Sequence, residues 1–204
     1  MTVSAIAVTP GSGANIWTDQ RTVSAVAREA QYVLIGEPAL ATYSVIAEEI
    51  SIATAADHVL QIMAGASNYV RIHYMMVEQA ADATTKAARA IELVRLTTAG
   101  TGGGAVTPRP FDTGDAAAGA TAMTLPTVKG TEGVKLLRAH LLFRQAVAAT
   151  AAQIDDIWEW TAHPRGKPII IPAGAANGIA IKNVTATAAA TANVTVIFTE
   201  TAWL

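Results

Sequence analysis

The sequence of 204 residues predicts an all-β protein, an antiparallel β-sandwich or jelly roll with long loops of small residues. Two observations predict this fold class. Apolar and polar residues alternate with a period of two in several segments, which is typical of strands with one buried face. Clusters of Gly, Pro and Asn separate these segments at short intervals, as turns do between antiparallel strands.

The alternation is clearest in four segments. These predicted strands are Tyr69–Glu78, Leu137–Phe143, Ile157–Thr161 and Asn193–Glu200. In the last segment the pattern predicts a core face of Val194, Val196 and Phe198. In the first segment it predicts a shared face of Val70, Ile72, Tyr74 and Met76. In Leu137–Phe143 it places Leu137, Ala139, Leu141 and Phe143 opposite Arg138, His140 and Arg144.

Three other segments are less clear. Ser44–Ala56 reads either as a helix or as two short strands with a turn at Glu48-Glu49. Thr84–Leu96 contains good helix formers, but its charged residues spread over about half of a helical wheel, which favours a strand from about Ile91. Asp112–Met123 is rich in Ala and Gly and predicts an extended surface loop.

We expect two parts along the chain. Residues 1–29 contain Pro10, Gly11 and Gly13 among small residues, and predict an N-terminal arm or edge strand. Residues 30–204 predict the β-sandwich domain. The longest stretch without charge, Asn183–Thr199, alternates Thr, Asn and Ala, so it does not predict a membrane span. The first residues have no basic region of the kind that opens a signal peptide.

Composition argues against several classes of function. The net charge is −2 with 15% charged residues, so the clustered basic surface of a nucleic-acid-binding protein is not expected. The chain has no Cys, which excludes disulfides, zinc–thiolate sites and thiol nucleophiles. The mean hydropathy of +0.34 is high for so little charge and indicates apolar surface buried beyond one core, as in a homo-oligomer.

Two motifs suggest chemistry, but both are better explained as turns or loops. Asp112-Thr113-Gly114 spells the triplet of aspartic proteases, which need two such carboxylates, so one copy would require a symmetric dimer. The alternative is an Asp that caps its own turn. Gly100–Gly104 is rich in glycine, but no Lys or helix start follows it, so a loop between strands is favoured over a phosphate site.

The ionisable residues predict no local site. A local metal site needs two ligands within about four residues of each other. No two of the four histidines, His58, His73, His140 and His163, are that close in the sequence. The pairs Glu48-Glu49 and Asp155-Asp156 are adjacent in sequence, and neighbours on a strand point to opposite faces. We therefore predict no catalytic residue, no metal ligand and no cofactor, and we expect that the protein is not an enzyme.

Trp158 and Trp160 lie two residues apart and therefore on one face of a strand. Two indoles on one face could stack against a sugar, but the large apolar area of Trp favours a core or subunit contact. Asn183 and Asn193 each begin an Asn-Val-Thr sequon, which would be modified only in a secreted protein.

Three stretches resemble structural proteins of tailed bacteriophages. They are Leu60–Gly65 within HVLQIMAGASNYVRIHYMMVEQ, Pro172–Ile179 within KPIIIPAGAANGIAIKNV, and the alternating hairpin that ends in NVTVIFTE. The resemblance extends from Asp57 to the end of the sequence and carries no catalytic residue. It implies a compact β-sandwich or jelly roll that acts as a capsid decoration (cement) protein, head fibre or minor tail component.

The resemblance leads to one functional expectation and its alternatives. We expect a virion structural protein that binds the outside of the major capsid protein lattice and bridges its subunits. Decoration proteins of this kind are often trimers, so a homo-oligomer is expected, located on the capsid exterior after assembly in the host cytoplasm. The alternatives are a head-fibre or tail protein and a receptor- or carbohydrate-binding module, with Trp158 and Trp160 as its platform.

Overall fold

The computed structural model describes residues 17–23, 26–32, 40–81, 87–143, 157–163, 166–186 and 190–202. The chain divides into two units, Met1–Ala39 and Leu40–Leu204. The division therefore falls later than the one expected from the sequence, between residues 29 and 30. The first unit contains β1 (Trp17–Val23) and β2 (Val26–Tyr32), which pair as an antiparallel two-stranded sheet.

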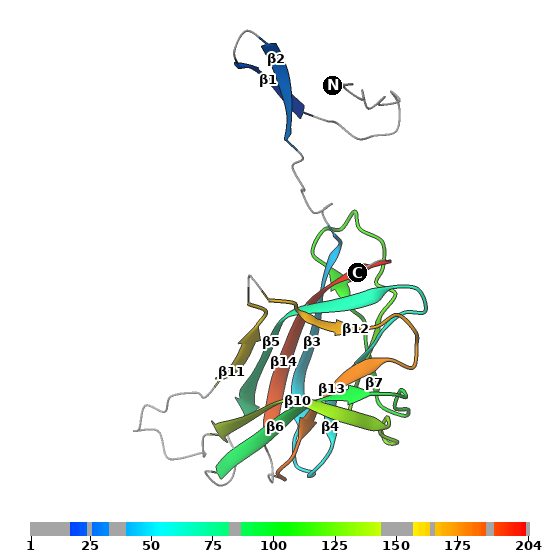
Figure 1. The fold of residues 1–204 in the computed structure, drawn as a ribbon. Helices are drawn as coiled ribbons and strands as arrows, with labels where there is room; N and C mark the ends of the chain where they lie inside the picture. Colours follow the sequence, from blue (N-terminus) through cyan, green and yellow to red (C-terminus); the bar gives the residue numbers. More distant parts are fainter. Residues whose placement is uncertain are drawn as a thin grey trace. The chain divides into compact units, whose positions relative to one another are not determined.

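The second unit is built from two antiparallel sheets, and its described part contains strands but no helix (Figure 1). Sheet I has the order β11-β5-β14-β3-β8, with β12 also beside β5. Sheet II has the order β10-β6-β13-β4-β9-β7. The strands of sheet I are β3 (Thr42–Ser51), β5 (Tyr69–Ala81), β8 (Arg109–Pro110), β11 (Ile157–Thr161), β12 (Ile169–Ile171) and β14 (Thr191–Thr201). Those of sheet II are β4 (His58–Met63), β6 (Ala87–Leu96), β7 (Gly104–Val106), β9 (Thr121–Thr124), β10 (Glu132–Phe143) and β13 (Gly178–Asn183). The predicted all-β sandwich is confirmed.

The strands pair in a nested order. β6 pairs with β10, β5 with β11 and β12, β4 with β13, and β3 with β14. In this nesting the partners β6 and β10 are the closest in sequence, and the partners β3 and β14 are the farthest apart. This order is compatible with a jelly roll, in which successive strand pairs alternate between two sheets.

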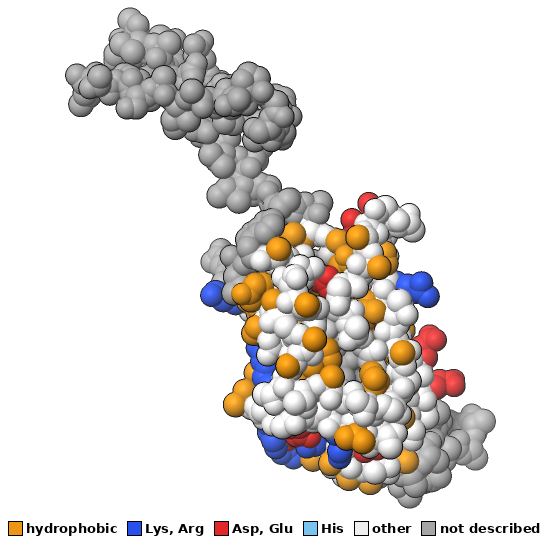
Figure 2. Space-filling model, turned by 90° about the vertical axis from the view of Figure 1, so that its right-hand side faces the viewer, with side chains coloured by type: hydrophobic (Ala, Val, Ile, Leu, Met, Phe, Trp, Pro, Cys, Tyr) orange, Lys and Arg blue, Asp and Glu red, His pale blue; other side chains and the backbone are white. Residues whose placement is uncertain are grey.

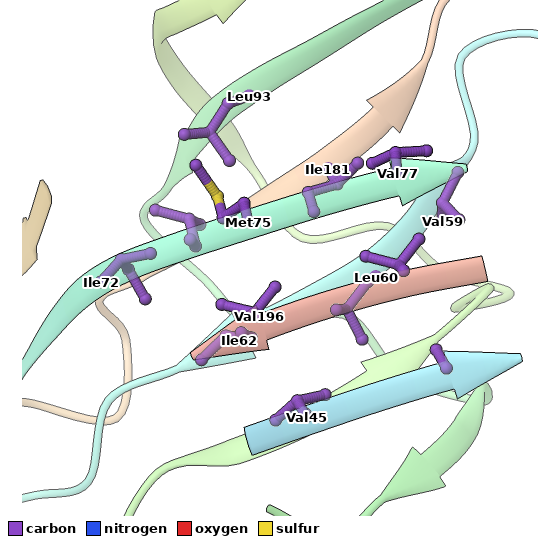
Figure 3. Packing of buried hydrophobic residues seen from close by; sticks show 14 of the residues in the cluster. Val45, Val59, Leu60, Ile62, Ile72, Met75, Val77, Leu93, Ile181 and Val196 are labelled. Carbon is purple, nitrogen blue, oxygen red and sulfur yellow. The ribbon is translucent and has the colours of Figure 1, made fainter. Parts of the chain in front are cut away.

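The core fills the space between the sheets. Sheet I contributes Val45, Ile72, Met75, Val77 and Val196, and sheet II contributes Val59, Leu60, Ile62, Leu93 and Ile181 (Figure 3). The core also contains Phe198 in β14, whose ring stacks on Tyr43 with centroids 5.5 Å apart. Burial of each such side chain stabilises the fold by roughly 1.5–3 kcal/mol before conformational entropy is subtracted. The predicted core face Val194, Val196 and Phe198 is confirmed, since each is completely buried.

A β-bulge changes the predicted pattern in β5. Along β14, Ile197 lies opposite Tyr74 but Phe198 lies opposite Ile72, so His73 is an extra residue. Val70 and Ile72 face the core as predicted, but after the bulge the core face continues with Met75 and Val77. The predicted shared face of Val70, Ile72, Tyr74 and Met76 is therefore wrong, because Tyr74 and Met76 lie on the other face of the strand.

The less clear segments are strands or loops. Ser44–Ala56 is neither a helix nor two strands: β3 runs without a break through Ser51, with a bulge at Glu48-Glu49, and a turn follows. β6 confirms the strand favoured for Thr84–Leu96 but already begins at Ala87. In Leu137–Phe143, Leu141 is buried while Arg138 and His140 are exposed, as predicted; Arg144 lies outside the described residues.

Candidate functional surfaces and the buried polar network

Two loop segments cover the outer face of sheet II. We call residues 97–103 and 125–131 the covering segments. They are joined by a bridge between Thr101 and Val128 and by the hydroxyl of Thr98, which accepts a hydrogen bond from the amide of Thr131. A second small apolar cluster lies on this face of the sheet. Its members are Met63, Val94, Leu96 and Ala180, all nearly inaccessible to solvent.

Under the covering segments lies a buried polar network centred on β4. The side-chain Oε1 of Gln61 accepts a hydrogen bond from the amide of Gly100 at 2.9 Å, which fixes the orientation of the Gln61 amide group. Its Nε2 then donates to Nδ1 of His58 at 2.6 Å. Nδ1 is therefore an acceptor, so the proton of the neutral imidazole lies on Nε2, which donates to Glu132 at 3.0 Å. His58 is completely buried.

The network continues to the edge of the covering segments through Glu132. The other carboxylate oxygen of Glu132 accepts a hydrogen bond from Nζ of Lys182 at 2.8 Å. Next to it, the Lys129 ammonium donates to the carbonyl of Ala56 at 3.1 Å. These contacts fasten the start of β10 to β4 and β13, and the second covering segment to the turn before β4.

The environment shifts the pKa values of both ionisable partners. Burial lowers the pKa of His58 below its ordinary value of 6.5, and the opposing effect of Glu132 is smaller. Burial alone would raise the pKa of Glu132, but hydrogen bonds from Lys182 and His58 outweigh it and hold that pKa below its ordinary range. His58 is thus neutral at pH 7 with both ring nitrogens bonded, an arrangement that orients side chains and holds loops.

A second charged group lies on the same face of sheet II. The carboxylate of Glu92 is buried, and one of its oxygens accepts hydrogen bonds from Lys135 at 2.9 Å and Arg138 at 3.3 Å. Lys135 and Arg138 are themselves more than half exposed. The two surface cations therefore compensate the buried Glu92 carboxylate. Because both cations belong to β10 and Glu92 belongs to β6, these ion pairs also hold β10 beside β6.

The loop between β8 and β9 is fastened to the end of sheet I. The carboxylate of Glu200 accepts hydrogen bonds from the backbone amides of Gly119 at 2.9 Å and Ala120 at 2.6 Å. The hydroxyl of Tyr43 donates to the carbonyl of Ala116 at 3.0 Å. Burial raises the pKa of Tyr43, and the charges of Glu200 and Asp115 add to this effect.

The Asp112 motif forms a turn. The side-chain Oδ1 of Asp112 accepts a hydrogen bond from the amide of Gly114 at 2.8 Å, and its carbonyl accepts one from the amide of Asp115 at 3.0 Å. Asp112 is exposed in the loop after β8. This geometry is the self-capping Asp turn that we favoured over a protease triplet.

The glycine run is part of the first covering segment. Gly100 is buried, and a Cβ there would lie 2.8 Å from the side-chain amide of Gln61 and from Cβ of Pro126. Gly102 has a φ of +75°, a conformation that L side chains rarely adopt. The glycines therefore allow the segment to approach sheet II closely, and the interpretation as a loop between strands is confirmed, with a packing role that the sequence did not predict.

The structure does not bring the predicted ionisable residues together as a site. His73 bonds Thr199 through Nε2 at 2.8 Å, while His140 and His163 are exposed. Within the described ranges, no group of three His, Asp or Glu side chains is placed to hold a metal ion. Asp155-Asp156 lie outside the described residues.

The bulge at Glu48-Glu49 places these two glutamates near Glu78 at one end of sheet I, which we call the acidic end. Asn193 lies opposite both glutamates: its Oδ1 accepts the amide proton of Glu49 at 2.9 Å, and its Nδ2 donates to Glu78 at 3.2 Å. Glu49 has a φ of +53°. A shallow depression of about 310 Å³ is lined by Glu48, Glu49, Ala80 and Asn193.

The two sequons differ in their surroundings. Asn183 is completely buried, and its Nδ2 donates to the carbonyls of Ile52 and Thr54 at 2.8 and 2.9 Å, so this side chain fastens the turn after β3. Asn193 is half-buried in the acidic end of sheet I.

Trp158 and Trp160 face inward. Both indoles are half-buried and pack against the core, while Ile157, Glu159 and Thr161 on the opposite face of β11 are exposed. The interpretation as core residues is therefore favoured over an exposed sugar platform.

The outer face of sheet I is a regular surface that no described segment of the second unit covers. The register places two rows of side chains across its centre. One row contains Glu159, Met76, Thr195 and Ile46, and the other contains Thr161, Tyr74, Ile197, Ser44 and Arg109. Both rows mix apolar and uncharged polar groups on β3, β5 and β14 and have one charged residue at an edge strand, and Ile46 is 54% exposed.

Comparison with known proteins identifies no relative. No family model, no curated protein and no solved structure matches the chain. In the part of the chain that the structure describes, no helix has the length and apolarity needed to span a membrane.

Sequence reasoning missed the polar network. His58 was considered only as a metal ligand, and neither Gln61 nor Glu132 was singled out. One signal was present: Gln61 interrupts the apolar run Val59–Ala64, and a polar residue in a buried strand needs hydrogen-bond partners. Its partners, Gly100 and Glu132, lie too far along the chain for local patterns to reveal them.

Proposed function

We propose that this chain is a structural protein of a tailed-bacteriophage virion, a decoration protein that binds the outside of the major capsid lattice and bridges neighbouring subunits. The observation that carries the proposal is a pair of strongly exposed apolar side chains, one in the second covering segment and one at the start of β10. Val128 in the second covering segment is 64% exposed, and Val134 at the start of β10 is 67% exposed. Apolar side chains that are exposed on a well-fastened segment stabilise a complex when a partner buries them.

The character of the surface supports the same proposal. On the side of the sandwich drawn in Figure 2, hydrophobic side chains lie among uncharged ones, and most charged side chains lie towards the margin. Protein interfaces likewise carry few charges in their buried centre and more at their rim. The hydrogen bonds of His58, Lys129 and Glu132 hold the covering segments in place, so docking would require little ordering of the loop.

The function would then be mechanical. The sandwich acts as a rigid block, the covering segments contact the capsid, and the chain adds buried area between capsid subunits without a chemical step. The homo-oligomeric state, the capsid exterior as location and assembly in the host cytoplasm belong to the same proposal.

Localisation on purified particles tests the proposal. We expect immunogold electron microscopy to label the whole capsid surface, and quantitative mass spectrometry to give a copy number that matches a set of symmetry-equivalent capsid sites. Absence of the chain from intact particles, or label confined to the tail, would contradict it.

A matched pair of variants tests the surface itself. We expect Val128→Arg to reduce the amount of protein bound to particles at least about tenfold, because a charge would enter an apolar contact. Ser67→Arg places the same charge on the exposed turn between β4 and β5, and binding should stay at the wild-type level. Equal binding of both variants would show that the covering segments are not the contact surface.

A further inference from the structure

We propose that the outer face of sheet I binds a second copy of this chain, face to face, about a two-fold axis that runs across the strands. This inference concerns the face opposite the covering segments. It gives the proposed homo-oligomer a specific form, a two-fold dimer, and it does not require binding to the capsid. It follows from the distribution of charge along the strands, which makes the face complementary to itself in one orientation.

The two ends of this face carry opposite charges. At one end lie Glu48, Glu49 and Glu78, grouped around Asn193 by the bulge in β3. At the other end lies Arg71, beside Thr199 in the register, and one row nearer the centre Arg109 lies beside Ser44 on the edge strand β8. Asp112 belongs to the loop that continues beyond β8, not to the sheet.

On the three middle strands the centre of the face is uncharged and in part apolar, and the charged residues of the same rows, Glu159 and Arg109, lie on the edge strands β11 and β8. The central side chains come from β3, β5 and β14, and they are Ile46, Tyr74, Met76, Thr195 and Ile197. Ile46 is 54% exposed and the others are half-buried. A β-branched and aromatic centre between charged ends is the composition of a protein interface with a desolvated core and a polar rim.

The charge pattern selects one of the two simple symmetric arrangements. A two-fold axis parallel to the strands would place acidic end on acidic end. An axis across the strands reverses their direction in the second copy, so each acidic end lies over a basic end. In that arrangement Met76 packs on Tyr74 of the other copy, Glu78 lies over its Arg71, and Glu48 lies near its Arg109.

The size of the face determines the expected affinity. Strands about 5 Å apart with a rise of about 3.3 Å per residue give this face roughly 500 Å² in each copy. Two copies then bury on the order of 1,000 Å², which is at the lower end for a specific interface. We therefore expect a reversible dimer that forms at micromolar concentration.

Sedimentation of the full chain between about 1 and 500 µM tests the inference. We expect wild type to shift from monomer to dimer, and Ile46→Arg to weaken association at least about tenfold. Val134→Arg, an equally exposed apolar position on sheet II, should associate like wild type. A chain that stays monomeric, forms a trimer, or responds to Val134→Arg but not to Ile46→Arg overturns the inference.

Charge exchange tests the direction of the axis. Glu48→Arg and Arg109→Glu should each weaken the dimer by about three- to tenfold, and the double variant should restore most of it. A double variant weaker than either single one would exclude the axis across the strands.

Cross-linking gives a readout that does not depend on affinity alone. The chain has no Cys, so a single introduced thiol reports one position. Thr195→Cys lies near the proposed axis, and sheets that pack face to face are about 10 Å apart, so a bismaleimide of about that length should link two copies. Val134→Cys should remain unlinked, and linkage of Val134→Cys in place of Thr195→Cys would overturn the inference.

Discussion

Acidification should destabilise the sandwich through His58. The perturbation is a change from pH 7.5 to about pH 5, above the range in which Glu132 loses its charge. Nδ1 of His58 already accepts the Gln61 amide, and that amide is held in its orientation by Gly100. A proton on Nδ1 would face the N–H donor of Gln61. If the Gln61 amide group rotated to present its oxygen to Nδ1, its N–H would point at the backbone N–H of Gly100.

The sign and size follow from proton linkage. Burial lowers the pKa of His58 in the folded state, so the unfolded chain binds more protons below pH 6.5. The free energy of unfolding is therefore unaffected above pH 6.5 and falls as the pH drops towards the folded-state pKa. One group gives a slope of up to about 1.4 kcal/mol per pH unit, so we expect a loss on the order of 1 kcal/mol across this window.

Urea unfolding at a series of pH values measures this loss. His58→Asn removes the titrating group, so this variant should lose most of the pH slope between pH 7 and 5, whatever its stability at pH 7. His140→Gln removes an exposed histidine and should keep the slope of wild type. The reasoning is refuted if His58→Asn keeps the full slope, or if wild type gains stability on acidification.

Three further changes test the packing and the loop contacts. Gly100→Ala would place a Cβ 2.8 Å from the buried side chain of Gln61, so thermal unfolding should show that the free energy of unfolding falls by about 1–3 kcal/mol. A Cβ at Gly119 has ordinary contacts from 3.4 Å, so Gly119→Ala should lose less stability. Glu200→Gln removes the charge and leaves one of the two backbone amides without an acceptor, so it should cost about 1–3 kcal/mol in urea unfolding, with faster proteolysis of the loop between β8 and β9 as a second readout. Phe198→Ala should cost about 3–5 kcal/mol in urea unfolding because the ring is completely buried, and a similar loss for the half-exposed Ile46→Ala would contradict the assigned core.

The fold class was predictable because alternation is a local signal. β14 shows why: Val194, Val196 and Phe198 face the core in the predicted phase over the whole segment. β5 shows the limit, because the extra residue His73 reverses the phase and moves Met75 inward. A bulge depends on the neighbouring strand as much as on its own sequence, so the pattern in one strand does not reveal it.

The polar network was not predictable for a different reason. Gln61 is informative by itself, since it lies in an apolar run, but its meaning depends on Gly100 and His58 together. The glycine run was predicted to be a loop without a specific role. Only the packed structure shows that Gly100, in this run, lets the backbone approach the buried side-chain amide of Gln61.

The position of β14 in sheet I has a consequence for how the protein is made. β14 lies between β5 and β3, and its residues are the last in the chain to enter either sheet. On the ribosome, β3 and β5 are synthesised long before the strand that joins them, so sheet I cannot be completed until β14 has left the exit tunnel. Pairing over such sequence distances is slow, so we expect refolding on a scale of milliseconds to seconds. During synthesis the nascent chain would expose the edges of β3 and β5 until β14 pairs with both.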